Sequence, residues 1–363
     1  MATKITDEAV ANFQQRRQRV AERIETGGEA ALLVTDLKNI QYLTGFSGSN
    51  AVLLLRADGS SVLGTDGRYD TQIRLETGAP QDIDIRVENR LLPLMKDVAG
   101  SAGFAVEPSL PVGSARELGD PSVLSGAVEA ERLLKDEREV RALLAAGELA
   151  DSVWTKFIAD GGIREGLTEI EAAADLENRL RLAGAEALSF DTILASGENG
   201  AKPHAGVSRD KIVPGLVTVD FGIYLNGYAS DQTRAVCVGE PDELAQEVYD
   251  IVYRAQKAGE EVVKPGTSLR AVDSACRDLI TDAGYGEYFV HSTGHGVGLD
   301  VHEAPRAAAG VDEQSILEEG MTITVEPGIY LPGKTGLRIE NTYVVTKEGH
   351  ISCNASPTEL VVV

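Results

Sequence analysis

The sequence predicts two domains of different class, an α/β domain followed by a larger α+β domain. The chain has 363 residues, which is more than one average domain. Short apolar runs alternate with helical stretches in the first third, whereas the remainder shows the order helix, helix, strand, strand twice over. We therefore expect one domain over residues 1–128 and a second over residues 129–363, with the segment 119–128 as the linker.

The N-terminal domain is predicted to begin with an amphipathic helix over residues 13–28, which ends at two glycines. Turns rich in Asp and Gly separate the segments that follow. Strand-like runs lie at 30–34, 51–55, 61–63 and 83–87, with a helical stretch near 67–77. Alternation of strands and helices over about 125 residues is typical of an α/β domain.

The C-terminal domain is predicted to consist of two similar halves. In the first half, Thr168 and Glu171 form a capping box that opens the second helix. The predicted helices are 136–160 and 168–184 and then 241–264 and 267–284; the predicted strands are 217–224 and 227–238 and then 321–326 and 337–346. We expect these halves to be related by a pseudo-two-fold axis, with helices on one face of an antiparallel sheet and a site on the other.

The composition limits the classes of partner. The net charge is −23, from 34 basic and 57 acidic residues, so nucleic acids and anionic membranes would be repelled. No apolar run approaches the length of a membrane span. The N-terminus lacks an export pattern, and three cysteines without a Cys-x-x-Cys pair fit a reducing compartment, so we expect a cytoplasmic protein. The acidic surface fits a high-salt habitat and an ordinary solvated surface equally well.

A glycine-rich segment over residues 291–303 holds three of the five histidines of the chain, His291, His295 and His302. Its alternating glycines disfavour a helix and allow close approach to the backbone. Such a concentration of histidine in a histidine-poor chain indicates a metal or catalytic site, and the partners for a hard metal would be carboxylates.

The first carboxylates lie on a predicted hairpin. Asn226-Gly227 is the strongest hairpin signal in the sequence, and a turn there places Asp220 opposite Thr233. Asp231 is two residues from Thr233 and therefore shares a sheet face with Asp220. Two acids on one face repel each other unless a cation lies between them.

The second pair of strands places Glu326 and Glu340 on one sheet face in the same way, with Arg338 beside Glu340. Four carboxylates carry a charge of −4, which two divalent ions balance. We therefore predict a dinuclear metal site with the ligands Asp220, Asp231, His295, Glu326 and Glu340.

A phosphate-loop pattern over residues 328–335 offers an alternative, nucleotide hydrolysis. That chemistry requires a helix that starts at Lys334-Thr335. The residues that follow alternate as a strand does, so we interpret the match as accidental.

The motifs together resemble the aminopeptidase P and prolidase family of Xaa-Pro peptidases. The resemblance rests on Asp220-Phe221-Gly222, Gly227 to Arg234, Gly294 to Leu299, His302 to Pro305, Glu326-Pro327-Gly328 with Tyr330, Gly336 to Glu340 and Pro203-His204. Segments 42–46 and 65–69 resemble the N-terminal domain of the family. The resemblance implies a creatinase-like N-terminal domain, a pita-bread C-terminal domain, two Mn, Co or Zn ions with Mn expected first, and a homodimer.

The same resemblance implies a role for each site residue. Asp220 would bind one metal, Asp231 and Glu340 would bridge both, and His295 and Glu326 would complete the other. A metal-bridging hydroxide would attack the bond before a proline in second position of a small peptide, with Glu326 as proton shuttle. The remaining predicted roles are oxyanion or proline binding for His302 and His291, substrate binding for His204 and orientation of ligands for Arg338. A non-catalytic peptide-binding member of the fold is the second alternative.

Overall fold

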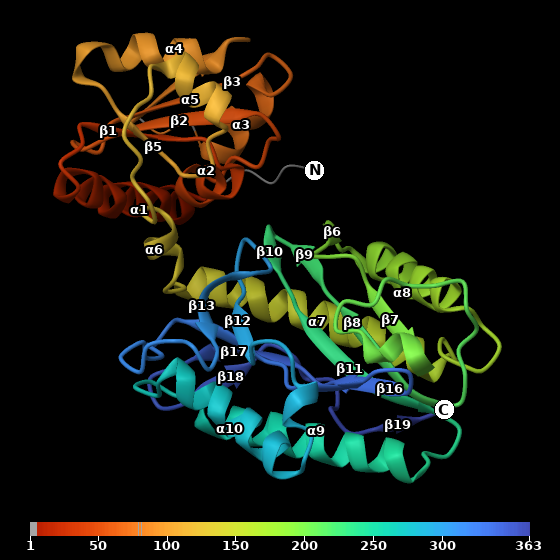
Figure 1. Ribbon diagram of the computed structural model, residues 1–363. Helices are drawn as coiled ribbons and strands as arrows, with labels where there is room; N and C mark the ends of the chain where they lie inside the picture. Colours follow the sequence, from red (N-terminus) through yellow and green to blue (C-terminus); the bar gives the residue numbers. More distant parts are fainter. Residues whose placement is uncertain (1–5, 79, 81) are drawn as a thin grey trace. The chain divides into compact units, whose positions relative to one another are not determined.

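The computed structural model describes residues 6–78, 80 and 82–363, and the chain divides into two compact units, Met1–Arg132 and Leu133–Val363 (Figure 1). The first unit includes the short helix α6 (Glu129–Arg132), which the sequence-based boundary after residue 128 assigns to the second domain. That boundary stays a prediction. No helix of the described residues is both long and apolar enough to cross a membrane.

The first unit is an α/β domain around a five-stranded mixed sheet of order β4-β3-β2-β1-β5. Its strands are β1 (Ala31–Val34), β2 (Ala51–Arg56), β3 (Ser61–Thr65), β4 (Ile83–Val87) and β5 (Ala105–Val106). Its other helices are α1 (Asp7–Thr26), α2 (Leu37–Thr44), α3 (Asp70–Thr77), α4 (Leu91–Ala99) and α5 (Val112–Leu118). The sequence analysis found neither α2, α4 and α5 nor β5.

The predicted linker belongs to this first unit. Val123 forms a β-bridge with Val106, and the Val106 backbone also hydrogen-bonds on both sides, to Ser122 and Leu124. The segment expected to connect the domains is therefore attached to the edge of the first sheet.

The second unit begins with the first of the two predicted halves. Helices α7 (Glu137–Ala159) and α8 (Glu169–Ala183) both open with a capping box, at Asp136 and at Thr168. They pack with β7 (Ile193–Ser196), β8 (Gly215–Phe221) and β11 (Gln232–Val238) into one apolar core. Strands β6 (Ala187–Leu188), β9 (Ile223–Leu225) and β10 (Tyr228–Ala229) form a small separate sheet beside β8.

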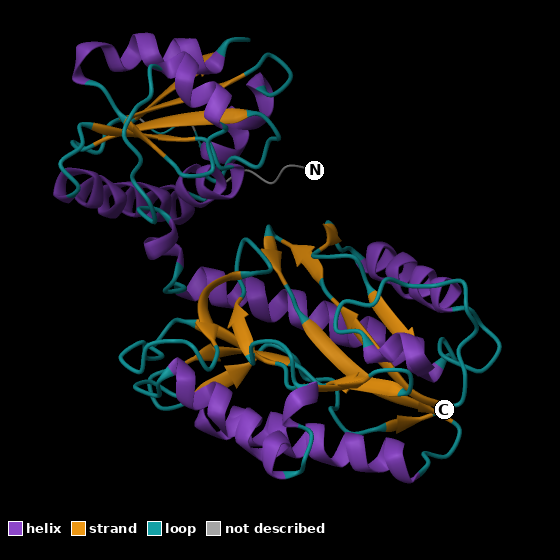
Figure 2. Ribbon diagram, in the orientation of Figure 1, coloured by secondary structure: helices purple, strands orange, loops and turns teal. Residues whose placement is uncertain are grey.

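The second half repeats this arrangement. Helices α9 (Glu243–Val262) and α10 (Leu269–Asp282) pack with β14 (Thr322–Val325), β15 (Gly328–Leu331), β16 (Thr335–Arg338) and β17 (Asn341–Val345) into a second core. The remaining strands are β12 (Gly294–Gly296), β13 (Glu303–Ala307), β18 (His350–Ser352) and β19 (Val361–Val362). The helix pairs α7/α8 and α9/α10 thus pack against the strands of this unit, as predicted, but the strands form several smaller sheets rather than one antiparallel sheet (Figure 2).

Two expectations for the second half have different outcomes. The strand predicted over 337–346 is wrong as a single element, because the chain leaves β16 after Arg338 and enters β17 only at Asn341. The phosphate-loop pattern lies in the antiparallel β15–β16 hairpin, with Lys334 exposed in the turn and no helix after it. Its interpretation as accidental is confirmed.

Candidate metal centre

All the residues predicted for the site line one cavity of about 910 Å³ in the second unit. The cavity lies on the sheet face that the helices leave free. Alternate side chains of β8 point into the core on one face and into the cavity on the other. Val217, Val219 and Phe221 enter the core under α7 and α8, whereas Asp220 faces the cavity. The two-residue period of the strand thus separates core from site.

The predicted hairpin brings the first two acids together. Asn226 and Gly227 both have positive φ, as a tight hairpin turn requires, and Asp220 pairs with Thr233 across β8 and β11. One oxygen of each of Asp220, Asp231 and Glu340 lies within 4.8 Å of the other two. The sequence prediction that these carboxylates converge is confirmed.

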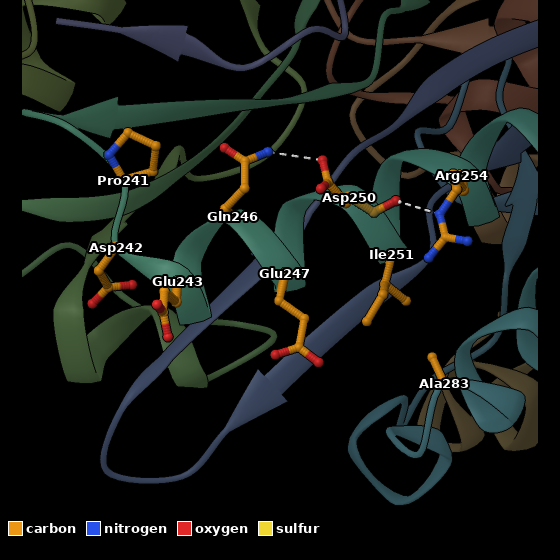
Figure 3. Close-up of a pocket in the computed structure, with 9 residues that line it drawn as sticks. All are labelled: Pro241, Asp242, Glu243, Gln246, Glu247, Asp250, Ile251, Arg254 and Ala283. Atoms are coloured by element: carbon orange, nitrogen blue, oxygen red, sulfur yellow. Dashed lines mark hydrogen bonds between the residues drawn. The ribbon is translucent and has the colours of Figure 1, made fainter.

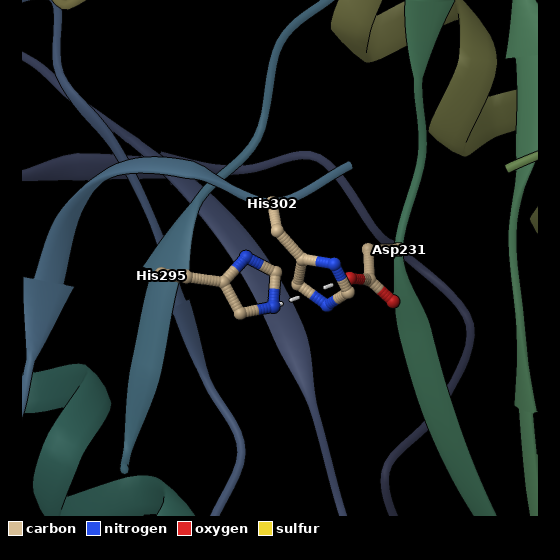
Figure 4. Close-up of side chains that lie close together, drawn as sticks. All are labelled: Asp231, His295 and His302. Atoms are coloured by element: carbon tan, nitrogen blue, oxygen red, sulfur yellow. Dashed lines mark ion pairs between the residues drawn. The ribbon is translucent and has the colours of Figure 1, made fainter. Parts of the chain in front are cut away.

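His295 joins the acids from β12. Its Nε2 lies 3.6 Å from Asp231 Oδ2 and 3.4 Å from Glu326 Oε1, while Nδ1 lies 3.0 Å from the carbonyl of Gly296. Donation of the Nδ1 proton to that carbonyl leaves Nε2 with a free lone pair toward the carboxylates. His302 packs edge-on against His295, with ring centroids 4.4 Å apart (Figure 4).

The glycines around His295 are required by neighbouring backbone. A Cβ on Gly294 would lie 1.8 Å from the carbonyl oxygen of Thr324, and one on Gly296 would lie 2.1 Å from that of Ala304. Both distances are far shorter than any real contact. The alternating glycines therefore let β12 pass close to β13 and β14, which fixes where the imidazole points.

The electrostatics of the cavity call for cations. Burial raises the pKa of Asp231 and of Glu340 well above the ordinary value, and repulsion from the neighbouring carboxylates adds to it. Burial likewise raises the pKa of Glu326 to about 8. Asp220 Oδ1 is buried without a hydrogen-bond partner among the described residues. Oxygen donors with one neutral imidazole, and an unsatisfied carboxylate oxygen, fit divalent metal ions.

Arg338 organises one wall of the site. It donates from Nη2 to Asp220 Oδ2 (2.5 Å) and from Nε to Thr233 Oγ1 (3.1 Å). Thr233 Oγ1 in turn donates to Glu340 Oε2 at 2.7 Å. The guanidinium thus contacts one predicted ligand directly and another through a hydroxyl. Its role in orienting metal ligands stays a prediction.

Tyr330 is a site residue to which the sequence analysis gave no role, although its motif was recognised. Arg338 Nη1 donates to its hydroxyl at 2.7 Å, and that hydroxyl lies 2.9 Å from His291 Nε2. The other ring nitrogen of His291 lies 2.8 Å from the carbonyl of Ser292, and burial lowers the pKa of His291 to about 4. Both ring nitrogens of neutral His291 are therefore engaged by the protein.

His204 and Arg306 lie at the exposed rim of the cavity. The carbonyl of the preceding residue, Pro203, accepts from Arg338 Nη1, which ties the His204 loop to the site. The Arg306 backbone pairs with His295 in the β12–β13 register, and its side chain forms no hydrogen bond or ion pair with any described residue. Arg306 was not predicted; its signal in the sequence is its place four residues after His302, directly after the segment His302 to Pro305.

A second hollow, of about 750 Å³, lies along α9 and is also rich in acids, among them Asp242, Glu243, Glu247 and Asp250 (Figure 3). These four side chains are exposed and spread along the helix, and Asp250 accepts a hydrogen bond from Gln246. No histidine lines it.

The chain matches two known families. Residues 141–347 match metallopeptidase family M24, and residues 16–139 match the creatinase/prolidase N-terminal domain. This chain is 36% identical over 358 residues to an Xaa-Pro dipeptidase of Pyrococcus horikoshii. The aligned region covers 96% of this chain and 99% of the relative.

Solved structures give the same result. An Xaa-Pro dipeptidase from Bacillus anthracis superposes with a TM-score of 0.90 at 36% identity, covering 97% of this chain and 100% of the other. An X-Pro aminopeptidase from Thermotoga maritima superposes with a TM-score of 0.85 at 34% identity, covering 96% and 99%. The pita-bread fold with a creatinase-like N-terminal domain, expected from the sequence, is confirmed.

Proposed function

Because the chain belongs to metallopeptidase family M24, we propose that it hydrolyses the peptide bond between an N-terminal residue and a following proline. The observation that carries this proposal is the convergence of four carboxylates and one imidazole in a cavity that the two halves of the second unit build together. The names of its relatives, which include Xaa-Pro dipeptidases and an X-Pro aminopeptidase, support the substrate class.

We propose that two divalent ions, with Mn²⁺ first and Co²⁺ or Zn²⁺ as alternatives, occupy the cavity. Asp220 would bind one ion, Asp231 and Glu340 would bridge the two, and His295 and Glu326 would complete the second. When bound, such a pair supplies a Lewis acid and lowers the pKa of water at the site. Charge supports more than one ion, since four carboxylates and the Arg338 guanidinium beside Asp220 sum to −3, and one divalent ion would still leave the site negative.

The protein groups then divide the remaining work. Glu326 would carry the proton of the attacking water to the departing proline nitrogen, because its carboxylate lines the cavity 3.4 Å from His295 Nε2. His302, which lines the cavity and is exposed, would donate toward a developing oxyanion. His291 would position Tyr330, to whose hydroxyl its Nε2 is hydrogen-bonded. His204 would contact the substrate at the rim of the cavity.

The position of Arg306 at the rim of the cavity favours dipeptides over longer peptides as substrates. The free carboxylate of an Xaa-Pro dipeptide needs a cation, and Arg338 is already committed to Asp220, Thr233 and Tyr330. Arg306 has no protein partner among the described residues. A charge-assisted contact of this kind makes a difference of about 10- to 100-fold in kcat/KM.

The alternative of a non-catalytic peptide-binding protein lacks support, because no predicted ligand is displaced from the cavity. A cytoplasmic location and a homodimer remain part of the proposal, on the composition and on the family respectively.

The test is to load the protein with Mn²⁺ and follow release of proline from Gly-Pro, beside Gly-Pro-amide and a longer Xaa-Pro-Xaa peptide. We expect cleavage of Gly-Pro, and we expect Arg306→Gln to reduce kcat/KM for Gly-Pro while leaving that for Gly-Pro-amide unchanged. If no Xaa-Pro bond is cut with Mn²⁺, Co²⁺ or Zn²⁺ at low or high salt, the proposed activity is wrong.

A further inference from the structure

Arg234 is a fully buried cation directly behind the candidate metal centre. It follows Thr233 on β11, so its side chain points to the opposite sheet face, and it is only 1% exposed. Its guanidinium makes five hydrogen bonds: to Ser356 Oγ (2.8 Å), Ser356 O (3.0 Å), Thr233 O (3.0 Å), Glu340 O (2.6 Å) and Asn341 Oδ1 (2.9 Å).

These bonds join the two halves of the second unit at the ligands. Thr233 O accepts from the backbone N–H of Glu340 at 3.2 Å and from Arg234 Nη1, which also donates to Glu340 O. The guanidinium therefore links the two carbonyls of the isolated β-bridge between Thr233 and Glu340. Hydrogen bonds therefore hold both the N–H and the carbonyl of Glu340, and they fix its backbone beside Thr233, two residues from Asp231.

The C-terminal segment 353–356 adds further hydrogen bonds behind the metal centre. Asn354 accepts a hydrogen bond from the Thr342 N–H and donates one to Gln232 Oε1, while Ser356 Oγ accepts one from Arg234. The Ala355 N–H donates to Asp151 Oδ2 on α7. One short segment thus connects a helix of the first half with strands of both halves.

Among the described residues, no carboxylate lies within hydrogen-bond distance of the Arg234 guanidinium to offset its burial. The nearest, Asp151 Oδ1, lies 3.9 Å away, and most of the contacts of the guanidinium are to neutral oxygens. Burying such a cation is costly compared with an apolar side chain of similar volume. Its planar fork, however, reaches several carbonyls at once, which a lysine ammonium cannot do.

We propose that Arg234 is a positioning residue for the metal centre: by holding the Thr233 and Glu340 carbonyls from behind, it sets the separation of the Asp231 and Glu340 carboxylates and so the affinity for the ions they share. This inference rests on the metal site of the proposed function.

The experiment is calorimetric titration of the metal-free, full-length protein with Mn²⁺, for wild type and Arg234→Lys. Lysine keeps the charge but cannot hold both carbonyls together with Ser356 and Asn341, so we expect Mn²⁺ affinity to fall about 10- to 100-fold. At saturating Mn²⁺ the KM for Gly-Pro should stay unchanged, because Arg234 does not line the cavity.

Arg17→Lys is the matched control. Arg17 is also 1% exposed and donates to a backbone carbonyl, that of Leu43 at 2.7 Å, but it lies in the first unit. Both variants should lower the melting temperature, and only Arg234→Lys should weaken Mn²⁺ binding. Ser356→Ala, which removes a single partner of Arg234, provides a milder variant in case Arg234→Lys does not fold, with an expected loss of about threefold.

The outcomes separate the two proposals. If wild type binds no Mn²⁺, the proposed metal site fails and this inference with it. If wild type binds and Arg234→Lys, or Ser356→Ala in its place, retains wild-type affinity, Arg234 serves stability alone and only this inference is overturned.

Discussion

Two hollows of the second unit are each lined by several carboxylates, and they differ in how those carboxylates are buried and arranged. In the central cavity Asp220, Asp231 and Glu340 are buried and point at one another. Along α9 the acids are exposed and spaced along the helix, where water screens each charge. Acid count therefore does not identify a metal site. Convergence of desolvated carboxylates does, because such an arrangement is unfavourable until cations occupy it.

The largest test of this comparison is to neutralise one acid in each hollow. We expect Asp231→Asn to reduce kcat/KM for Gly-Pro by more than about 100-fold, beyond the usual cost of losing an outer-shell partner. Asp250→Asn on α9 should leave activity and Mn²⁺ binding unchanged. Steady-state kinetics on both variants makes the comparison. Equal losses in the two would mean that the hollows do not differ as described.

Removal of metal should affect stability by several kcal/mol. Ions that bind only the folded state at 100 times their Kd stabilise it by about 2.7 kcal/mol per site. Chelation should therefore lower the melting temperature by about 5 °C or more for a unit of this size. Thermal denaturation with and without chelator measures it. An unchanged melting temperature in wild type would argue against ions at the carboxylates.

In metal-free protein, Glu340→Gln should be more stable than wild type at pH 8, by an amount on the order of 1 kcal/mol. The pKa of Glu340 is raised, so the folded state holds more protons than the unfolded state above the ordinary value near 4.5. Wild-type stability therefore falls as pH rises from that value, and the amide escapes this loss. Urea denaturation at pH 5 and pH 8 checks the sign. With Mn²⁺ present, the order of the two proteins should reverse.

The smallest effect concerns Glu260, an acid of α9 that has cations beside it. Its carboxylate lies 3.8 Å from His350 Nε2 and accepts from Lys257, and His350 lowers the pKa of Glu260 to about 2. The neighbouring Glu260 carboxylate raises the pKa of His350. The contribution of His350 is therefore full below its ordinary pKa near 6.5 and is lost as pH rises through the raised value.

We accordingly expect His350→Gln to destabilise the protein by at most about 1 kcal/mol at pH 5.5 and by less at pH 8.5. Denaturant midpoints at the two pH values are the measurement. A larger cost at pH 8.5 would contradict the sign.

Features encoded in neighbouring residues were predictable from sequence. The Asn226-Gly227 turn fixed the register that places Asp220 opposite Thr233, and the capping box at Thr168 began α8 where expected. These signals involve residues within a few positions of one another. The alternation of apolar and polar residues in β8 then separated the core face from the site face.

Features that depend on distant residues were not predictable. The residues after Gly336 alternate as a continuous strand, yet the strand is interrupted between Arg338 and Asn341. There, Arg234 and Thr233, more than 100 positions earlier, bind the Glu340 backbone. The engagement of both nitrogens of His291 likewise depends on Tyr330, which only the folded chain brings near. The attachment of segment 122–124 to Val106 has the same origin.

The most direct test of the account is an anomalous difference map from crystals of the Mn²⁺-loaded protein. The account predicts two peaks in the central cavity, about 3.5–4 Å apart and both in contact with Asp231 and Glu340. No peak in that cavity, or peaks only along α9, would contradict it.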